Sequence, residues 1–96
     1  MAQQVASTLH ERINRLLDLS FREWERLPAV EGEIDGWDLL EQIDFVEEWT
    51  LAEERLLRLA RYANDGALTP PQEQRYREIM VLVVRHRPII TRLRAS

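Results

Sequence analysis

Residues 69–94, TPPQEQRYREIMVLVVRHRPIITRLR, decide the fold class of this chain. Their centre, residues 79–84, is the longest apolar run in the sequence and is rich in β-branched residues, so in isolation it is compatible with a buried strand. The residues on both sides are better helix formers. In addition, Thr69 and Gln72 form a capping box with Pro70 at the first helical position. These signals favour a helix that runs through the apolar centre.

Pro88 lies inside this predicted helix. Because proline lacks an amide hydrogen, it removes the hydrogen bond to the carbonyl of Val84, and we expect the helix to kink there. The apolar residues between 79 and 84 also cover more than one helix face, which is more than two neighbouring helices can bury. Surplus apolar surface on a small helical protein usually indicates self-association or a partner.

A second helix is predicted near the start of the chain, over residues 4–27. Its apolar residues recur at steps of three and four, and Ser20 is the one polar interruption. They are Val5, Leu9, Ile13, Leu16, Leu17, Trp24 and Leu27. Pro28 ends this helix, and residues 28–36 contain one proline and two of the three glycines. That composition predicts a loop.

The segment between these helices, residues 37–65, carries two apolar stripes that are out of phase. The first consists of Leu39, Leu40, Ile43 and Val46, and the second of Phe45, Trp49, Ala52, Leu56, Leu59, Ala60 and Ala63. Thr50 and Glu53 form a further capping box, a pattern that normally opens a helix. We therefore expect either a break in the helix near Thr50 or a rotation of the buried face there. The segment ends before Gly66, which suits a left-handed cap.

Together these signals predict an all-α protein, either a three-helix antiparallel bundle or an extended helical hairpin. We expect one small domain over residues 1–96, with the last helix over residues 70–94 and a thin core. No apolar run approaches the ~20 residues of a membrane span. The first residues show neither the basic nor the apolar region of a secretory signal, and cysteine is absent. We therefore expect a cytoplasmic protein without membrane contact.

Charge is strongly segregated along the chain, although the net charge is only −4. Residues 1–30 are balanced, whereas residues 31–54 carry ten acidic residues and no basic one. Residues 55–96 carry nine arginines against three acidic residues. One interpretation is that the acidic and basic segments pack against each other as a surface network of ion pairs. The other is that one of them is a binding surface.

The acidic segment is the predicted docking surface for a protein partner. Trp37 follows Asp35 and Gly36 at a helix start, and it is the tryptophan that we most expect to be exposed. Tryptophan often carries interface energy. The predicted partner-binding residues are Trp37, Asp38, Glu41, Asp44, Phe45, Glu47, Glu48 and Trp49, with the three aromatic residues as apolar anchors. Their charge favours a basic protein as the partner.

An enzymatic function has less support. Carboxylates on facing helices hold Mg²⁺ in helical nucleotide pyrophosphohydrolases. One helix face of this chain offers Asp38, Glu41, Asp44 and Glu48. A matching carboxylate pair on another helix is missing, and so is a lysine for phosphates. His10 and His86 lack the Glu-x-x-His step of di-iron sites. We predict no catalytic residue, no metal site and no cofactor, and a Mg²⁺-dependent nucleotide hydrolase is the alternative.

The C-terminal segment is the basic counterpart of the acidic one. Its arginines form a predicted basic face: Arg75, Arg77, Arg85, Arg87, Arg92 and Arg94. Such a face would bind nucleic-acid phosphates in a salt-dependent manner. A pI near 5.2 and the lack of a helix-turn-helix pattern disfavour this second alternative.

The sequence therefore predicts a small non-enzymatic interaction protein. An inhibitor, an antitoxin-like neutraliser or a small subunit of a larger complex would match this description. We expect it to bind a basic protein partner, or to form a homo-oligomer in which a dimer is favoured. All 13 cationic residues are arginine, a bias that is typical of GC-rich bacterial genes.

Overall fold

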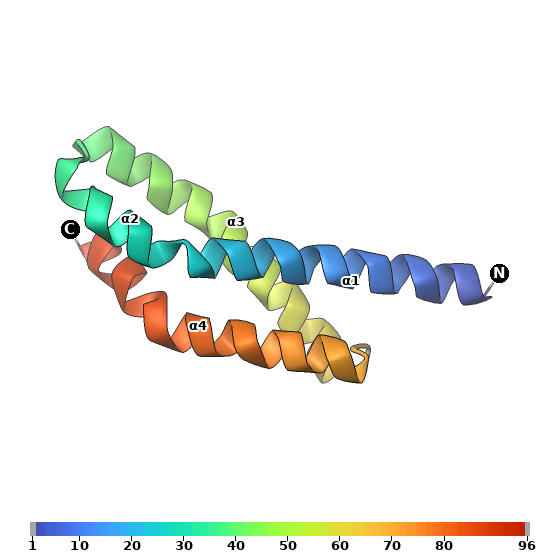
Figure 1. Cartoon of the computed structure of the whole chain (residues 1–96). Coiled ribbons are helices and arrows are strands. Elements are labelled where there is room, and N and C mark those ends of the chain that lie inside the picture. Colours follow the sequence, from blue (N-terminus) through green and yellow to red (C-terminus); the bar gives the residue numbers. More distant parts are fainter. Residues whose placement is uncertain (1, 96) are drawn as a thin grey trace.

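The computed structural model describes the backbone of residues 2–95 and the side chains of residues 8–95, and this part of the chain contains helices and no strand (Figure 1). The elements are α1 (Ala2–Glu25), α2 (Leu27–Glu33), the 3₁₀ turn η1 (Ile34–Gly36), α3 (Leu39–Asn64) and α4 (Pro70–Ala95). Because α2 continues α1 after a bend, the chain forms a three-helix bundle. The predicted all-α fold class is confirmed.

The prediction of a loop over residues 28–36 is wrong, because this stretch forms α2 and η1. Arg26, between α1 and α2, keeps helical backbone angles, and its carbonyl accepts the amide hydrogens of Ala29 (3.1 Å) and Val30 (3.3 Å). Pro28 lies in the first turn of α2, where a missing amide hydrogen costs no helical bond. The proline therefore redirects the chain without ending its helical structure.

The core lies where one apolar stripe from each long helix meets. Its fully buried large side chains include Trp24 and Leu17 of α1, Leu59 of α3 and Ile79 of α4. α1 packs against both other long helices, and α4 lies alongside it (Figure 1). The predicted stripe of the first helix is buried or half-buried from Leu9 onward. Val5 lies outside the residues whose side chains are described.

The capping box predicted at the start of α4 is present. The Thr69 amide donates to Gln72 Oε1 (2.9 Å), and the Gln72 amide donates to Thr69 Oγ1 (3.3 Å). Gln72 is buried, and its Nε2 also donates to Asn14 Oδ1 on α1 (3.1 Å), so it fixes the start of α4 against that helix. α4 then continues through Pro88 and bends near it, as Figure 1 shows.

α3 is one continuous helix, so the break expected near Thr50 is absent. Its buried face does not rotate either, because burial follows the second apolar stripe along the helix. The exposed residues of the first stripe are Leu39, Leu40 and Ile43. A tertiary contact decides between the stripes: the ring of Trp49 packs edge-on against Trp24 of α1, with centroids 4.9 Å apart. Leu39, Leu40 and Ile43 are consequently left at the surface, whereas Val46 packs against the core.

The bundle is elongated, with principal dimensions of 51 × 22 × 18 Å. Its radius of gyration over Cα atoms is 15.5 Å. A compact domain of this length has a radius of gyration of ~12–13 Å. Each long helix therefore exposes a large share of its surface. Among the described helices, none combines the length and the apolar composition of a membrane span.

Candidate protein-binding surfaces

Two of the three predicted aromatic anchors lie in the core. Phe45 and Trp49 are buried and stack on each other with ring centroids 5.9 Å apart. Trp37 is half-buried and lies against Phe45, with centroids 5.4 Å apart. The prediction that Phe45 and Trp49 anchor a partner is therefore wrong, because both side chains already stabilise the bundle. Trp37 keeps part of its surface accessible.

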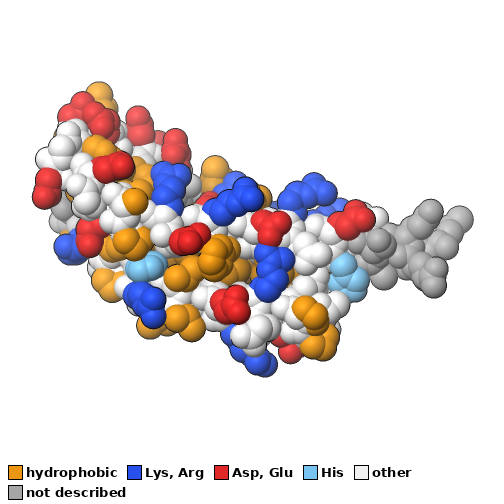
Figure 2. Space-filling view, in the orientation of Figure 1, with side chains coloured by type: hydrophobic (Ala, Val, Ile, Leu, Met, Phe, Trp, Pro, Cys, Tyr) orange, Lys and Arg blue, Asp and Glu red, His pale blue; other side chains and the backbone are white. Residues whose placement is uncertain are grey.

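An acidic surface with exposed apolar side chains covers the first half of α3. Leu39, Leu40 and Ile43 expose 68%, 70% and 43% of their surface. The acidic residues around them are all exposed and are Asp38, Glu41, Asp44, Glu47 and Glu48. We call these side chains together the acidic surface. Figure 2 shows acidic side chains gathered at the end of the molecule where η1 leads into α3.

The side chains of the acidic surface form no ion pair with any residue whose side chain is described. Asp38 caps α3, and its Oδ1 accepts the amide hydrogen of Glu41 at 2.8 Å. Elsewhere in the acidic segment, Glu31 pairs with Arg92, and Glu53 pairs with Arg87 at 2.9 Å. The ion pairs that the sequence analysis considered between the acidic and basic segments are therefore formed near the two ends of residues 31–54, at Glu31 and Glu53, and not between them.

The predicted basic face is divided by these pairs. Arg75 pairs with Asp18 of α1, and Arg87 and Arg92 reach α3 and α2. The guanidinium group of Arg87 also lies 5.3 Å from the ring centroid of Trp24. The remaining arginines of the face, Arg77, Arg85 and Arg94, are exposed. Arg77 lies 3.9 Å from Glu73, one turn earlier on α4. Arg85 and Arg94 form no ion pair with any described side chain.

A second apolar surface lies on the outer side of α4. Tyr76, Met80, Val84 and Pro88 recur at every fourth residue and form a ridge, with Val81 beside it. Val84 exposes 76% of its surface and Val81 55%. We call these residues, with Arg77 and Arg85 at their margin, the α4 surface. The surplus apolar residues at 79–84 were predicted from the sequence. The extension of the ridge to Pro88 was not predicted, although the four-residue spacing would have indicated it.

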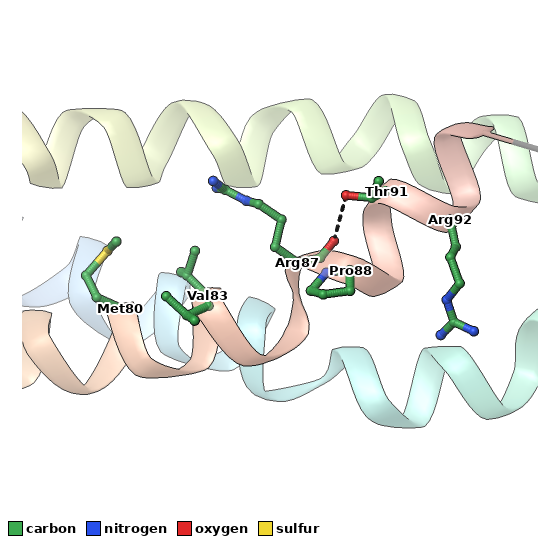
Figure 3. A pocket seen from close by; sticks show the side chains of 7 residues that line it. Met80, Val83, Arg87, Pro88, Thr91 and Arg92 are labelled. Carbon is green, nitrogen blue, oxygen red and sulfur yellow. Dashed lines mark hydrogen bonds between the residues drawn. The ribbon is translucent and has the colours of Figure 1, made fainter.

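Two adjoining shallow hollows lie along the α4 surface and share Met80 and Val84 in their lining. Their volumes are about 620 and 560 Å³, and their walls are almost entirely apolar. Figure 3 shows the second hollow, where Arg87 extends toward α3 and Arg92 toward α2. Because these two arginines turn away to their carboxylates, Val84 and Pro88 remain exposed in this hollow.

Glu23 is a carboxyl group whose pKa is clearly shifted. Its Oε2 accepts a hydrogen bond from Arg55 Nη1 at 2.6 Å, but its Oε1 is buried without a partner among the described atoms. Burial raises the pKa of Glu23 above its ordinary value of 4.5, against the opposing effects of Arg55 and Arg26. This pair joins α1 to α3 and lies away from both surfaces.

The described side chains bring no three His, Cys, Asp or Glu residues together in a way that could hold a metal ion. His10 and His86 are half-buried on different helices. Comparison with models of known protein families, with curated proteins and with solved structures gives no match to this chain. The two surfaces are therefore the features of this chain that point to a function.

Proposed function

We propose that this chain is a protein–protein interaction module that docks a basic partner through its acidic surface. One observation carries the proposal: Leu39, Leu40 and Ile43 are exposed side by side among carboxylates that form no ion pair with any side chain the structure describes. A partner that buries exposed apolar side chains gains free energy from their removal from water, and exposed charges mainly direct the encounter. A partner that matches this surface carries arginine or lysine around an apolar strip.

The class of partner follows from the same chemistry. A small acidic module that covers a basic surface acts as an inhibitor, as an antitoxin-like neutraliser, or as a small subunit of a larger complex. As part of this proposal we assign the protein to the cytoplasm of a bacterium, in line with its arginine-only cations and its lack of cysteine. Nucleic-acid binding by α4 has less support, because Arg75, Arg87 and Arg92 already bind carboxylates.

Charge reversal tests the proposal. A variant with Glu41→Lys, Asp44→Lys, Glu47→Lys and Glu48→Lys should lose the protein that copurifies with the wild-type chain from its native cells. A second variant, with Leu39→Ser, Leu40→Ser and Ile43→Ser, should lose the same protein without any change in charge. Mass spectrometry with labelled standards measures the copurified protein, and at least a tenfold loss is expected for each variant, corresponding to ~1.4 kcal/mol.

A matched control separates a local effect from a change in net charge. Glu11, Glu25, Glu33 and Glu54 are exposed, have no ion pair among the described residues, and lie outside the acidic surface. Their joint replacement by lysine changes the net charge equally and should leave the copurified protein in place. Equal recovery with the wild type and with both acidic-surface variants would contradict the proposal.

A further inference from the structure

The α4 surface has the chemistry that the acidic surface requires in a partner. Its ridge is apolar, and the two arginines at its margin, Arg77 and Arg85, are exposed. No acidic side chain lines either of its hollows. The acidic surface has the opposite charge around a similar apolar strip. The two surfaces are thus complementary in both charge and hydrophobicity.

The two surfaces also match in length and in secondary structure. Both are faces of long helices, and their apolar residues recur at steps of three or four. The ridge from Tyr76 to Pro88 is ~18 Å long at 1.5 Å per residue. The acidic surface extends over a similar distance, ~15 Å from Asp38 to Glu48, and its three apolar residues lie in the first half of that length. Rows of side chains at four-residue spacing are the elements that pack into the grooves of another helix.

One chain cannot join its own two surfaces. α3 already contacts α4 on a different side, where Glu53 binds Arg87. The first half of α3 lies against the C-terminal end of α4, where Ile43 and Glu47 line a hollow together with Leu93 and Arg94, and not against the α4 surface between Tyr76 and Pro88. A contact between the acidic surface and the α4 surface therefore has to be intermolecular.

We infer that the α4 surface is occupied by the acidic surface of a second copy of this chain. This inference rests on the proposed function, since it uses the acidic surface as a docking face and names a partner for it. Asp44 and Glu47 of one copy lie opposite Arg77 and Arg85 of the other, and the leucines of α3 cover the hollows beside Met80 and Val84. Since every copy carries one surface of each kind, a closed assembly satisfies all of them, and a two-fold dimer is the smallest.

Charge swapping tests this contact. The acid swap is Asp44→Arg with Glu47→Arg, and the base swap is Arg77→Glu with Arg85→Glu. We expect the wild-type chain to self-associate in sedimentation equilibrium between about 5 and about 500 μM at low salt, and each swap alone to weaken association at least ~10-fold. Mixing the two variants should restore association, because each mutated surface then meets one of opposite charge. The double swap in one chain should restore it as well.

The design separates a specific contact from loss of folding. Recovery on mixing occurs only if both variants are folded, and far-UV circular dichroism verifies this for each alone. Arg12→Glu with Arg15→Glu is the matched control, because both residues are exposed on α1 outside the two surfaces, and it should associate as the wild type does. The inference is overturned if the wild type stays monomeric throughout, if the acid swap still associates, or if mixing restores nothing.

The proposed function can be judged separately from this inference. A chain that is monomeric at all concentrations, but loses its copurified protein on reversal of the acidic surface, retains the proposed function and refutes self-docking. If the acid swap changes neither the self-association of the chain nor the amount of copurified protein, the proposed function and the self-docking inference are both refuted.

Discussion

Glu23 shows how one side chain can have two different environments. One carboxylate oxygen binds Arg55 across the contact between α1 and α3, and the other is buried without a hydrogen-bond partner in the described structure. The desolvation of the charged form outweighs the attraction of the arginine, and the pKa rises. A half-buried ion pair of this kind joins two helices but contributes little net stability at neutral pH.

This shift has a definite sign in the pH dependence of stability. Because the folded pKa lies above the ordinary value of 4.5, the folded chain retains a proton that the unfolded chain has already lost between these two values. The contribution of Glu23 to the free energy of unfolding is therefore complete below pH 4.5 and falls as the pH rises through the raised pKa. Glu23→Gln removes this dependence.

Urea unfolding of the wild type and of Glu23→Gln at pH 4 and pH 7 measures the effect. The wild type should be more stable relative to the variant at pH 4 than at pH 7, and the other carboxyl groups cancel in the difference. A difference between the two proteins that is the same at both pH values would show that the Glu23 pKa is not raised.

At the scale of the element, the sequence of α3 contains two capping patterns, at Asp38 and at Thr50, and only the one at Asp38 begins a helix. Asp38 begins the helix and binds the Glu41 amide, whereas Thr50 lies in the middle of the helix with its amide already in the helical ladder. A capping residue stabilises a helix only where amide hydrogens lack carbonyl partners. The sequence pattern at Thr50 is the same as at a true cap, so local sequence cannot distinguish them.

This difference predicts opposite outcomes for two alanine substitutions. Asp38→Ala should lower the free energy of unfolding by about 1 kcal/mol, because the Glu41 amide loses its acceptor. Thr50→Ala should leave it unchanged or raise it slightly, since alanine is the better residue inside a helix. Chemical denaturation of both variants decides the matter. A comparable loss for Thr50→Ala would indicate that α3 has a second helix start there.

The face that α3 buries could not be predicted either, for a related reason. Its two apolar stripes are out of phase and follow one another along the segment, so periodicity alone does not show whether the helix breaks, rotates its buried face or buries only one stripe. The contact of Trp49 with Trp24 selects one of them, and this contact depends on α1, which is far away in sequence. By contrast, the start of α4 was predictable because Thr69, Pro70 and Gln72 act locally.

At the scale of the whole molecule, the candidate site was predictable only in part. The segregation of charge predicts a binding surface on the acidic segment, and the structure shows that the carboxylates of that segment on the first half of α3 are exposed. The anchors were misassigned because aromatic residues are equally suited to an interface and to a core, and the bundle buries Phe45 and Trp49. In the function proposed above, the exposed leucines Leu39 and Leu40 serve as the apolar anchors in place of these rings.

The elongated shape leads to a prediction for scattering in solution. The base-swap variant, which should be monomeric, is expected to give a radius of gyration close to 15.5 Å in small-angle X-ray scattering, whereas a compact chain of this length gives ~12–13 Å. A dilution series excludes residual association. A value near that of the compact chain would mean that the helices fold back on one another more closely than in this bundle.

Trp37 gives the molecule a built-in optical reporter. Trp24 and Trp49 are shielded inside the bundle, so their fluorescence is insensitive to events at the surface. Trp37 lies half-buried directly before Asp38 at the start of α3, and its ring rests on Phe45. Any molecule that covers Leu39 and Leu40 also changes the access of water to the neighbouring indole. The emission of the unlabelled wild-type chain would therefore follow occupation of the acidic surface in real time.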